Sequence, residues 1–157
     1  MSVDPETKQL LEQLKSNDDQ IRDRATQALW EQWFQQKGLV GYNILIQSQM
    51  LMNASTFEQA EALLTDLIES QPDFAEAWNR RAVLYYVQRR YRAAIADCDQ
   101  VIRQFPFHFG AIHGKALCHM ALGEWHMAIA AFQQALAIQP HSLENQRMLL
   151  ECMSKLS

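Results

Sequence analysis

The sequence contains few of the residues that break helices and little cysteine: 157 residues include five glycines, four prolines and three cysteines. Cys98, Cys118 and Cys152 form no Cys-x-x-Cys pair and are odd in number, so we expect reduced thiols rather than the disulfide framework of a secreted protein. No stretch approaches the roughly 18 consecutive apolar residues of a membrane-spanning helix, and the polar N-terminus does not resemble a signal peptide. We therefore expect a cytoplasmic protein without a membrane span.

Basic residues are also in the minority, since 14 Lys and Arg stand against 18 Asp and Glu. A nucleic-acid-binding protein usually presents a basic surface, so we expect no nucleic-acid partner. The charges are unevenly distributed. Residues 41–74 contain five acidic residues and no Lys or Arg, whereas residues 75–108 contain six arginines and three acidic residues. The chain is therefore polarised, with an acidic segment followed by a basic one.

A repeat of 34 residues is the main feature that the sequence does contain. Pro72, Pro106 and Pro140 follow one another at this interval. Within an interval, apolar residues recur every three or four positions, which is the spacing of one face of a helix, and no segment alternates like a strand. Other positions 34 residues apart are also alike, namely Ala60, Ala94 and Ala128, and Phe57, Tyr91 and Trp125. The pattern predicts repeated hairpins of two helices that stack on one another.

These units resemble the tetratricopeptide repeat (TPR) family, whose 34-residue pattern reads W-x2-L-G-x2-Y, then A-x3-F, then P. Residues 75–108 carry the best copy, and residues 41–74 carry the weakest. The matching residues are Trp78, Ala82, Tyr85, Ala94 and Pro106 in the second unit, Ala116, Ala128, Phe132 and Pro140 in the third, and Ala60, Leu64 and Pro72 in the first. Arg81 stands where the pattern has its first Leu.

The resemblance implies an all-α fold, a right-handed superhelical stack of antiparallel helical hairpins that forms a TPR-type α-solenoid. We predict hairpins at residues 41–74, 75–108 and 109–142. Residues 1–40 should form an N-terminal helical hairpin, which resembles a HEAT-type cap through the stretch DDQIRDRATQAL, with a plain helical cap as the alternative. Residues 143–157 should form a C-terminal capping helix, and it carries more apolar residues than one inward stripe requires.

Four of the five histidines lie between residues 108 and 126, but they do not predict a metal site. His113 and His119 are six residues apart, which places them about 120° apart on a helix. Zinc needs three or four convergent ligands, and the pattern brings none together. No nucleophile, base and orienting group can be assembled either. We expect no metal, no cofactor and no enzymatic activity.

In TPR arrays, a second stripe on the first helix of each hairpin lines a concave groove that holds partner peptides. By this resemblance, the groove residues would be Tyr42, Leu45, Gln49 and Met52 from the first unit, Glu76, Asn79, Val83 and Tyr86 from the second, and Gly110, His113, Leu117 and Met120 from the third, with Arg80 at the edge. Many of these residues are apolar, and methionine and tyrosine suit adaptable contacts.

Some TPR proteins clamp the acidic C-terminal tails of chaperones with Lys and Asn on the first hairpin and Lys and Arg on the third. The matching residues here are Leu45, Gln49, Gly110 and Gly114, so the clamp is missing. We predict a non-enzymatic adaptor or scaffold whose groove binds an apolar or amphipathic segment of a protein partner. The alternative is a self-associating structural protein, a homodimer formed through the groove or the C-terminal helix.

Overall fold

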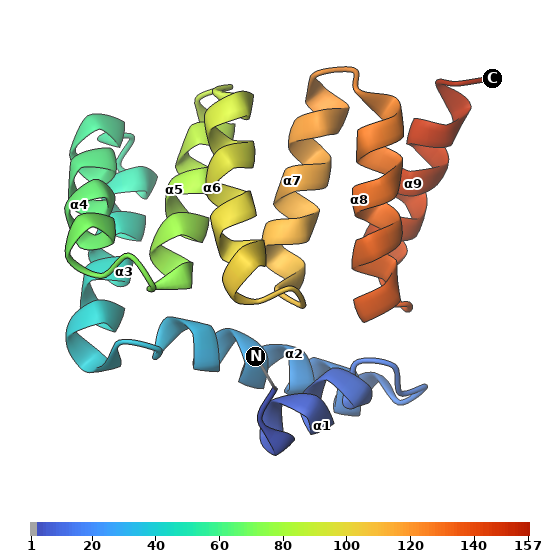
Figure 1. Ribbon diagram of the computed structural model, residues 1–157, viewed down its shortest axis with the longest axis horizontal. Helices are drawn as coiled ribbons and strands as arrows, with labels where there is room; N and C mark the ends of the chain where they lie inside the picture. The colour runs from blue at the N-terminus through green and yellow to red at the C-terminus, as the bar shows by residue number, and fades with distance from the viewer. Residues whose placement is uncertain (1–2) are drawn as a thin grey trace.

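The computed structural model describes residues 3–157, and every regular element in this range is an α-helix. The helices are α1 (Pro5–Gln13), α2 (Asp19–Phe34), α3 (Gly38–Asn53), α4 (Phe57–Ser70), α5 (Ala75–Val87), α6 (Tyr91–Gln104), α7 (Phe109–Ala121), α8 (Trp125–Ile138) and α9 (Leu143–Ser154). Helices α3 to α9 stand side by side in a row, and α1 and α2 run across their lower ends (Figure 1). The prediction of an all-α solenoid is confirmed.

The row consists of three hairpins, α3 with α4, α5 with α6 and α7 with α8, followed by the single helix α9. Small residues let the two helices of a hairpin approach closely. Ala82 on α5 and Ala94 on α6 are both buried, and they belong to one core cluster with Tyr85 and Cys98. Pro72, Pro106 and Pro140 each lie two residues beyond a second helix, where proline prevents the helix from continuing. Helix α3 begins at Gly38, three residues before the predicted start of the first unit.

Ion pairs formed by arginines of the basic segment join neighbouring helices. Arg90 of the basic segment donates to Glu61 of the acidic segment, with Nη1 2.7 Å from Oε1. Arg81 crosses from α5 to α6, where Nε and Nη2 donate to both carboxylate oxygens of Asp97 at 2.8 and 2.9 Å. Burial raises the pKa of Asp97, and the hydrogen bonds from Arg81 oppose that shift. Arg81 thus links the two helices of its hairpin through a polar contact, where the family pattern has an apolar Leu.

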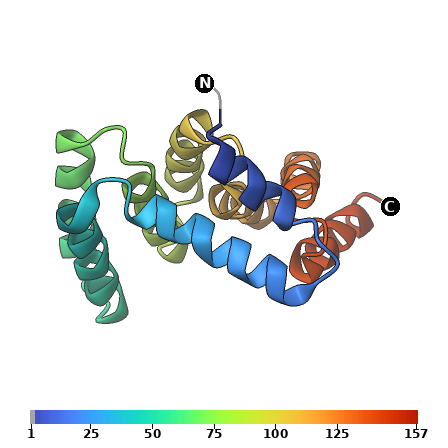
Figure 2. The ribbon, with the colours of Figure 1, turned by 90° about the horizontal axis from the view of Figure 1, so that it is seen from below.

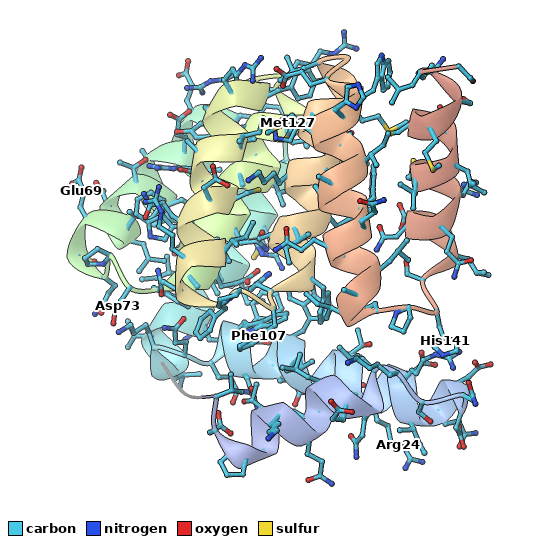
Figure 3. All side chains as sticks on the ribbon, turned by 45° about the vertical axis from the view of Figure 1, so that its right-hand side comes forward. Arg24, Glu69, Asp73, Phe107, Met127 and His141 are labelled. Atoms are coloured by element: carbon cyan, nitrogen blue, oxygen red, sulfur yellow. The ribbon has the colours of Figure 1, made fainter. Side chains whose placement is uncertain are left out.

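Helices α1 and α2 do not extend the stack as a further hairpin. Seen from below, they lie across the lower ends of the repeat helices (Figure 2). Trp33 and Leu29 of α2 are buried in a core cluster with Leu14 and with Phe109, the first residue of α7. Phe107, from the loop before α7, packs against the same cluster and lies beside α2 (Figure 3). The aromatic residues of this loop therefore determine where the N-terminal pair docks.

None of the helices described between residues 3 and 157 combines the length and the apolar character needed to cross a membrane.

Candidate functional site

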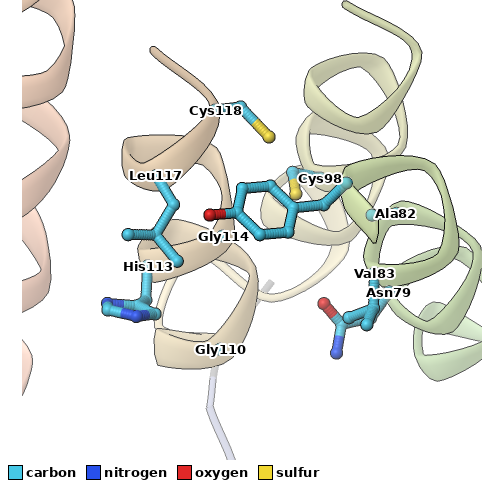
Figure 4. Close-up of a pocket in the computed structure, with 10 residues that line it drawn as sticks. Asn79, Ala82, Val83, Cys98, Gly110, His113, Gly114, Leu117 and Cys118 are labelled. Atoms are coloured by element: carbon cyan, nitrogen blue, oxygen red, sulfur yellow. The ribbon is translucent and has the colours of Figure 1, made fainter. Parts of the chain in front are cut away.

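A pocket of about 200 Å³ opens between α5 and α7, the first helices of the second and third hairpins. Asn79, Ala82 and Val83 line it from α5, while Gly110, His113, Gly114 and Leu117 line it from α7 (Figure 4). Tyr86, Cys98 and Cys118 complete the lining, which contains no Lys or Arg. The pocket therefore lies on the stripe of first-helix residues where the sequence predicts a groove.

The walls of the pocket are accessible and apolar. Val83 is 40% exposed and Tyr86 is 37% exposed, while Leu117 is half-buried. Tyr86 is oriented by Tyr91 of α6, whose ring meets it edge to face with centroids 5.7 Å apart. Burial of part of the Tyr86 ring also raises the pKa of its hydroxyl. A tyrosine held in this way presents a large apolar area at a low cost in conformational entropy.

Two cysteines contribute to the floor of the pocket. Cys98 and Cys118 are both 1% exposed and form no disulfide. Burial raises the pKa of both thiols, that of Cys118 to about 11. A buried neutral thiol behaves as a small apolar group and is chemically inert. The floor therefore adds to the apolar character of the pocket and offers no nucleophile.

The position of Gly114 gives the pocket its depth. A Cβ atom on Gly114 would meet only Cys98 Sγ, at 3.6 Å, which is an ordinary contact distance. The missing side chain thus leaves open space between the helices. Gly110, one turn earlier, is different, because a Cβ atom there would lie 2.4 Å from Trp30 Cη2. Trp30 of α2 thus packs directly on Gly110 and covers this end of the groove.

His113 joins α7 to α9 at the side of the pocket. Its Nδ1 lies 2.7 Å from Asn145 Oδ1, and because an amide oxygen only accepts, Nδ1 donates. Its Nε2 lies 3.6 Å from Glu144. Met120 and Leu117 pack against the cluster that contains Cys152 of α9. Three of the third-unit groove residues, His113, Leu117 and Met120, therefore also hold the C-terminal helix in place.

Two first-unit residues that we expected in the groove lie in the core instead. Leu45 is 1% exposed and packs with Leu64 and Phe74. Met52 is 8% exposed and packs in a separate cluster between α3, α4 and α5. Both are covered because the next hairpin stacks directly on α3. The prediction that these side chains face a partner was wrong.

Glu76 and Asn79, from the second unit, belong to a buried polar network rather than to an open surface. Glu76 is fully buried, and Asn79 Nδ2 donates to its Oε1 at 3.0 Å. His108 Nδ1 accepts from the Ala111 N–H at 3.0 Å, so its Nε2 carries the hydrogen and donates to Glu76 Oε2 at 3.1 Å. The His108 ring stacks on Trp33 with centroids 3.8 Å apart. The network fastens α2 to α5 and α7. Asn79 is 6% exposed and still reaches the pocket wall.

The remaining predicted residues connect α2, α3 and α5. Arg80 Nη1 donates to Gln49 Oε1 at 2.7 Å, and its guanidinium lies over the Phe34 ring, 4.8 Å from the centroid. Tyr42 meets the same ring edge to face, with centroids 6.5 Å apart. Phe34 is the last residue of α2, and no spacing in the sequence indicates that it reaches the groove. Arg80 is thus held in place by α2 and α3.

Among residues 3–157, no group of three or more His, Cys, Asp and Glu residues is arranged to hold a metal ion. His119 does not line the pocket, is 4% exposed and has its Nδ1 3.0 Å from Glu124 Oε1. His113 and His119 therefore serve different contacts on different sides of α7.

Comparisons with known proteins agree with this architecture. Two profiles of the Tetratricopeptide repeat family match residues 49–109 and 110–142. A TPR repeat-containing protein of Rhizobium etli is 38% identical over 77 residues, which are 49% of this chain and 38% of the relative. The BBS4 homologue of the Drosophila melanogaster BBSome complex is 21% identical over 120 residues, which are 76% of this chain and 24% of that protein. The chain thus spans well under half of the length of these relatives.

Solved structures share the same fold at low sequence identity. The first TPR domain of Spaghetti (RPAP3), bound to an HSP90 peptide, has a TM-score of 0.69 and 16% identity, with 72% of this chain and 90% of that chain covered. The TPR2B domain of yeast Sti1 in a complex with Hsp70 has a TM-score of 0.66 and 20% identity, with 72% and 95% covered. MamA has a TM-score of 0.68 and 18% identity, with 71% and 66% covered.

Proposed function

Because this chain belongs to the tetratricopeptide repeat family, we propose that it is a non-enzymatic adaptor that holds an apolar or amphipathic segment of a protein partner. The apolar pocket between α5 and α7 carries this proposal, because it is open and lies on the stripe of first-helix residues. Similar TPR domains have been solved bound to an HSP90 peptide and in a complex with Hsp70, which supports a peptide as the ligand. We also propose a cytoplasmic location, supported by three free cysteines.

The size and lining of the pocket indicate what part of the partner it takes. A cavity of about 150 Å³ lined by apolar side chains is large enough to bind benzene. The pocket of about 200 Å³ is thus wide enough for one aromatic or leucine side chain. Val83, Tyr86 and Leu117 would contact that side chain. A single buried anchor of this kind often provides most of the binding energy of an interface.

An acidic tail fits this groove less well than an apolar segment. The pocket contains no Lys or Arg to pair with a carboxylate. Of the positions that carry the clamp in chaperone-binding relatives, Leu45 is buried and Gly110 is covered by Trp30. A long basic side chain at position 110 would collide with the Trp30 ring unless α2 moved. We therefore propose that the partner offers an apolar side chain, displayed on an amphipathic helix.

Gly114→Leu tests this function, because Gly114 lines the pocket, a Cβ atom there makes only an ordinary contact, and the longer side chain would occupy the space of the anchor. We would select peptides from a display library of amphipathic helices on the wild-type chain and measure their affinity for both chains by fluorescence anisotropy. We expect selected peptides to carry an aromatic or leucine anchor and to bind Gly114→Leu at least about ten-fold more weakly. Leucine favours the helix over glycine, so thermal stability should be unchanged or higher.

Ala62→Leu is the matched control, because Ala62 is exposed on the outer helix α4, and the substitution adds a similar side chain away from the groove. It should bind the selected peptides like the wild type. Equal affinity of a folded Gly114→Leu chain for every selected peptide would show that the pocket does not hold the anchor.

Self-association is the second candidate function. The exposed apolar face of α9 favours that helix over the groove as the contact between copies, because Leu143 and Leu150 are 78% and 66% exposed.

A further inference from the structure

Helix α9 is the first helix of a hairpin that has no second helix among the described residues. Helices α5, α7 and α9 begin at residues 75, 109 and 143, which are 34 apart. In the α5–α6 hairpin, Ala75, Ala82 and Tyr85 pack in one cluster with residues of α6. The corresponding residues of α9 are Leu143, Leu150 and Met153, which are 78%, 66% and 49% exposed. The surface of α9 that should meet a second helix is therefore apolar and open.

The opposite side of α9 is already used, since Asn145 and Cys152 are buried against the third hairpin. Within residues 3–157, no other helix lies along the outer side of α9 at the end of the row (Figures 1 and 2). The exposed side also carries Arg147 and Glu151, and neither forms an ion pair within residues 3–157. The open face thus combines exposed leucines with charges that lack a partner.

The order of charges along α9 indicates the occupant. Glu144, Arg147, Glu151 and Lys155 alternate in sign along the helix. An antiparallel copy places Arg147 of each chain against Glu151 of the other, whereas Glu144 and Lys155 already contact His113 and the Trp125 ring of their own chain. A parallel copy would place like charges together. The charges of α9 therefore complement a second α9 in the antiparallel orientation.

We propose that two copies of this chain pair through antiparallel α9 helices, related by a twofold axis that crosses the helices near Leu149. This inference rests on the second candidate function and not on the groove. The two helices of every hairpin are also antiparallel, so an antiparallel α9 of a second copy would pack on α9 as the second helix of a hairpin packs on the first. Leu143 and Leu150 lie seven residues apart on the open face, which gives each helix an apolar seam.

The other exposed apolar helix face, on α3, fits this role less well. Its exposed residues include Leu39, Val40, Ile46 and Met50, and α3 contains no charged residue. It therefore offers nothing to pair with Arg147 or Glu151. Contact of α9 with α3 of another copy would also be heterologous, and such contacts produce open chains of copies rather than closed dimers.

Sedimentation velocity over a range from low micromolar to near-millimolar concentration tests the proposal on the full chain. A single helix pair is a small interface, so we expect a wild-type dimer that dissociates on dilution. Arg147→Glu and Glu151→Arg each place like charges together twice, and each should weaken the dimer about ten-fold. The double variant R147E/E151R restores both opposite-charge contacts and should dimerise like the wild type.

Arg103→Glu is the control, because it makes the same charge change at an exposed site on α6. It should leave the dimer unchanged, and circular dichroism should show that every variant is folded. A wild-type chain that stays monomeric throughout the range would overturn self-association itself. A dimer that Arg147→Glu does not weaken, or polymers that grow with concentration, would overturn the antiparallel α9 arrangement alone. None of these outcomes bears on peptide binding to the groove, which Gly114→Leu tests.

Discussion

The contact between His108 and Glu76 should contribute strongly to stability, and His108→Phe isolates that contribution. Phenylalanine keeps an aromatic ring against Trp33 and removes both polar contacts of His108. It removes the acceptor of the Ala111 N–H, which caps α7, and loss of an N-cap costs about 1 kcal/mol. It also removes the donor to a fully buried carboxylate oxygen, and leaving such a group unpaired costs about 1–3 kcal/mol.

The two effects predict that His108→Phe lowers the free energy of unfolding by about 2–4 kcal/mol. Urea unfolding followed by circular dichroism would measure this as a fall in the midpoint of roughly 1–2 M. In a Glu76→Gln chain, the same replacement leaves a neutral amide without its His108 partner, instead of a carboxylate oxygen. There it should cost less, by about 1–2 kcal/mol, and this difference is the coupling energy of the pair.

His126→Phe is the control, since His126 is exposed at the start of α8, and its replacement should change stability by no more than about 0.5 kcal/mol. An equal cost of His108→Phe in the wild-type and Glu76→Gln chains would refute the argument. The network would then not depend on the hydrogen bond between the two side chains.

Two further predictions concern α2 and acid stability. Gly110→Ala should destabilise the chain by about 1–3 kcal/mol, because the new methyl group collides with Trp30. Urea unfolding followed by tryptophan fluorescence would measure this. A variant that is more stable than the wild type, or that gives the same unfolding curve, would contradict the close contact. Hydrogen bonds from Arg92 and then His119 lower the pKa of Glu124 from 4.5. A carboxyl group whose pKa is lowered by folding stabilises the native state above its unfolded pKa, and that contribution is lost as the pH falls through the lowered value. Glu124→Gln should therefore be less stable than the wild type at neutral pH, and the difference between their urea midpoints should disappear below about pH 4. A difference that does not depend on pH would show that the contacts of the Glu124 carboxylate with Arg92 and His119 do not cause the loss of stability.

The stacked hairpins could be predicted from the sequence because residues at fixed positions of the repeat determine local helix packing and helix ends. Small residues at fixed positions, such as Ala82 and Ala94, allow close packing within each hairpin. Proline at the end of each unit stops the second helix. Since each hairpin packs mainly on its neighbours in sequence, the period alone determines most of the fold.

The position of α2 could not be predicted in the same way. The spacing of Leu29 and Trp33 shows that α2 has an apolar face, but not which surface covers it. The structure shows that Phe109 and the ring of His108 do so, although these residues lie more than seventy positions later in the sequence. The unbroken apolar and aromatic run around residues 105–109 was the only signal, and its partner had to be seen in three dimensions.

The groove was predicted residue by residue from its register, but register does not determine exposure. Leu45, Asn79 and His113 occupy the same position in successive units. Leu45 is in the core, Asn79 binds a buried carboxylate and His113 binds α9. The surroundings of each position differ because each unit has a different neighbour. Exposure therefore depends on tertiary contacts that a repeat pattern does not contain.

The two glycines of α7 show most directly how the pocket depends on individual residues. A glycine within a helix costs about 1 kcal/mol relative to alanine. At Gly110 packing explains the glycine, because Trp30 occupies the space of the missing side chain. At Gly114 packing gives no such reason, because a Cβ atom would meet only Cys98 Sγ at an ordinary distance. An alanine would therefore fit and would strengthen the helix, but it would narrow the space between α5 and α7. A side chain of a partner that enters the space between α5 and α7 would explain why the less stabilising Gly114 is present.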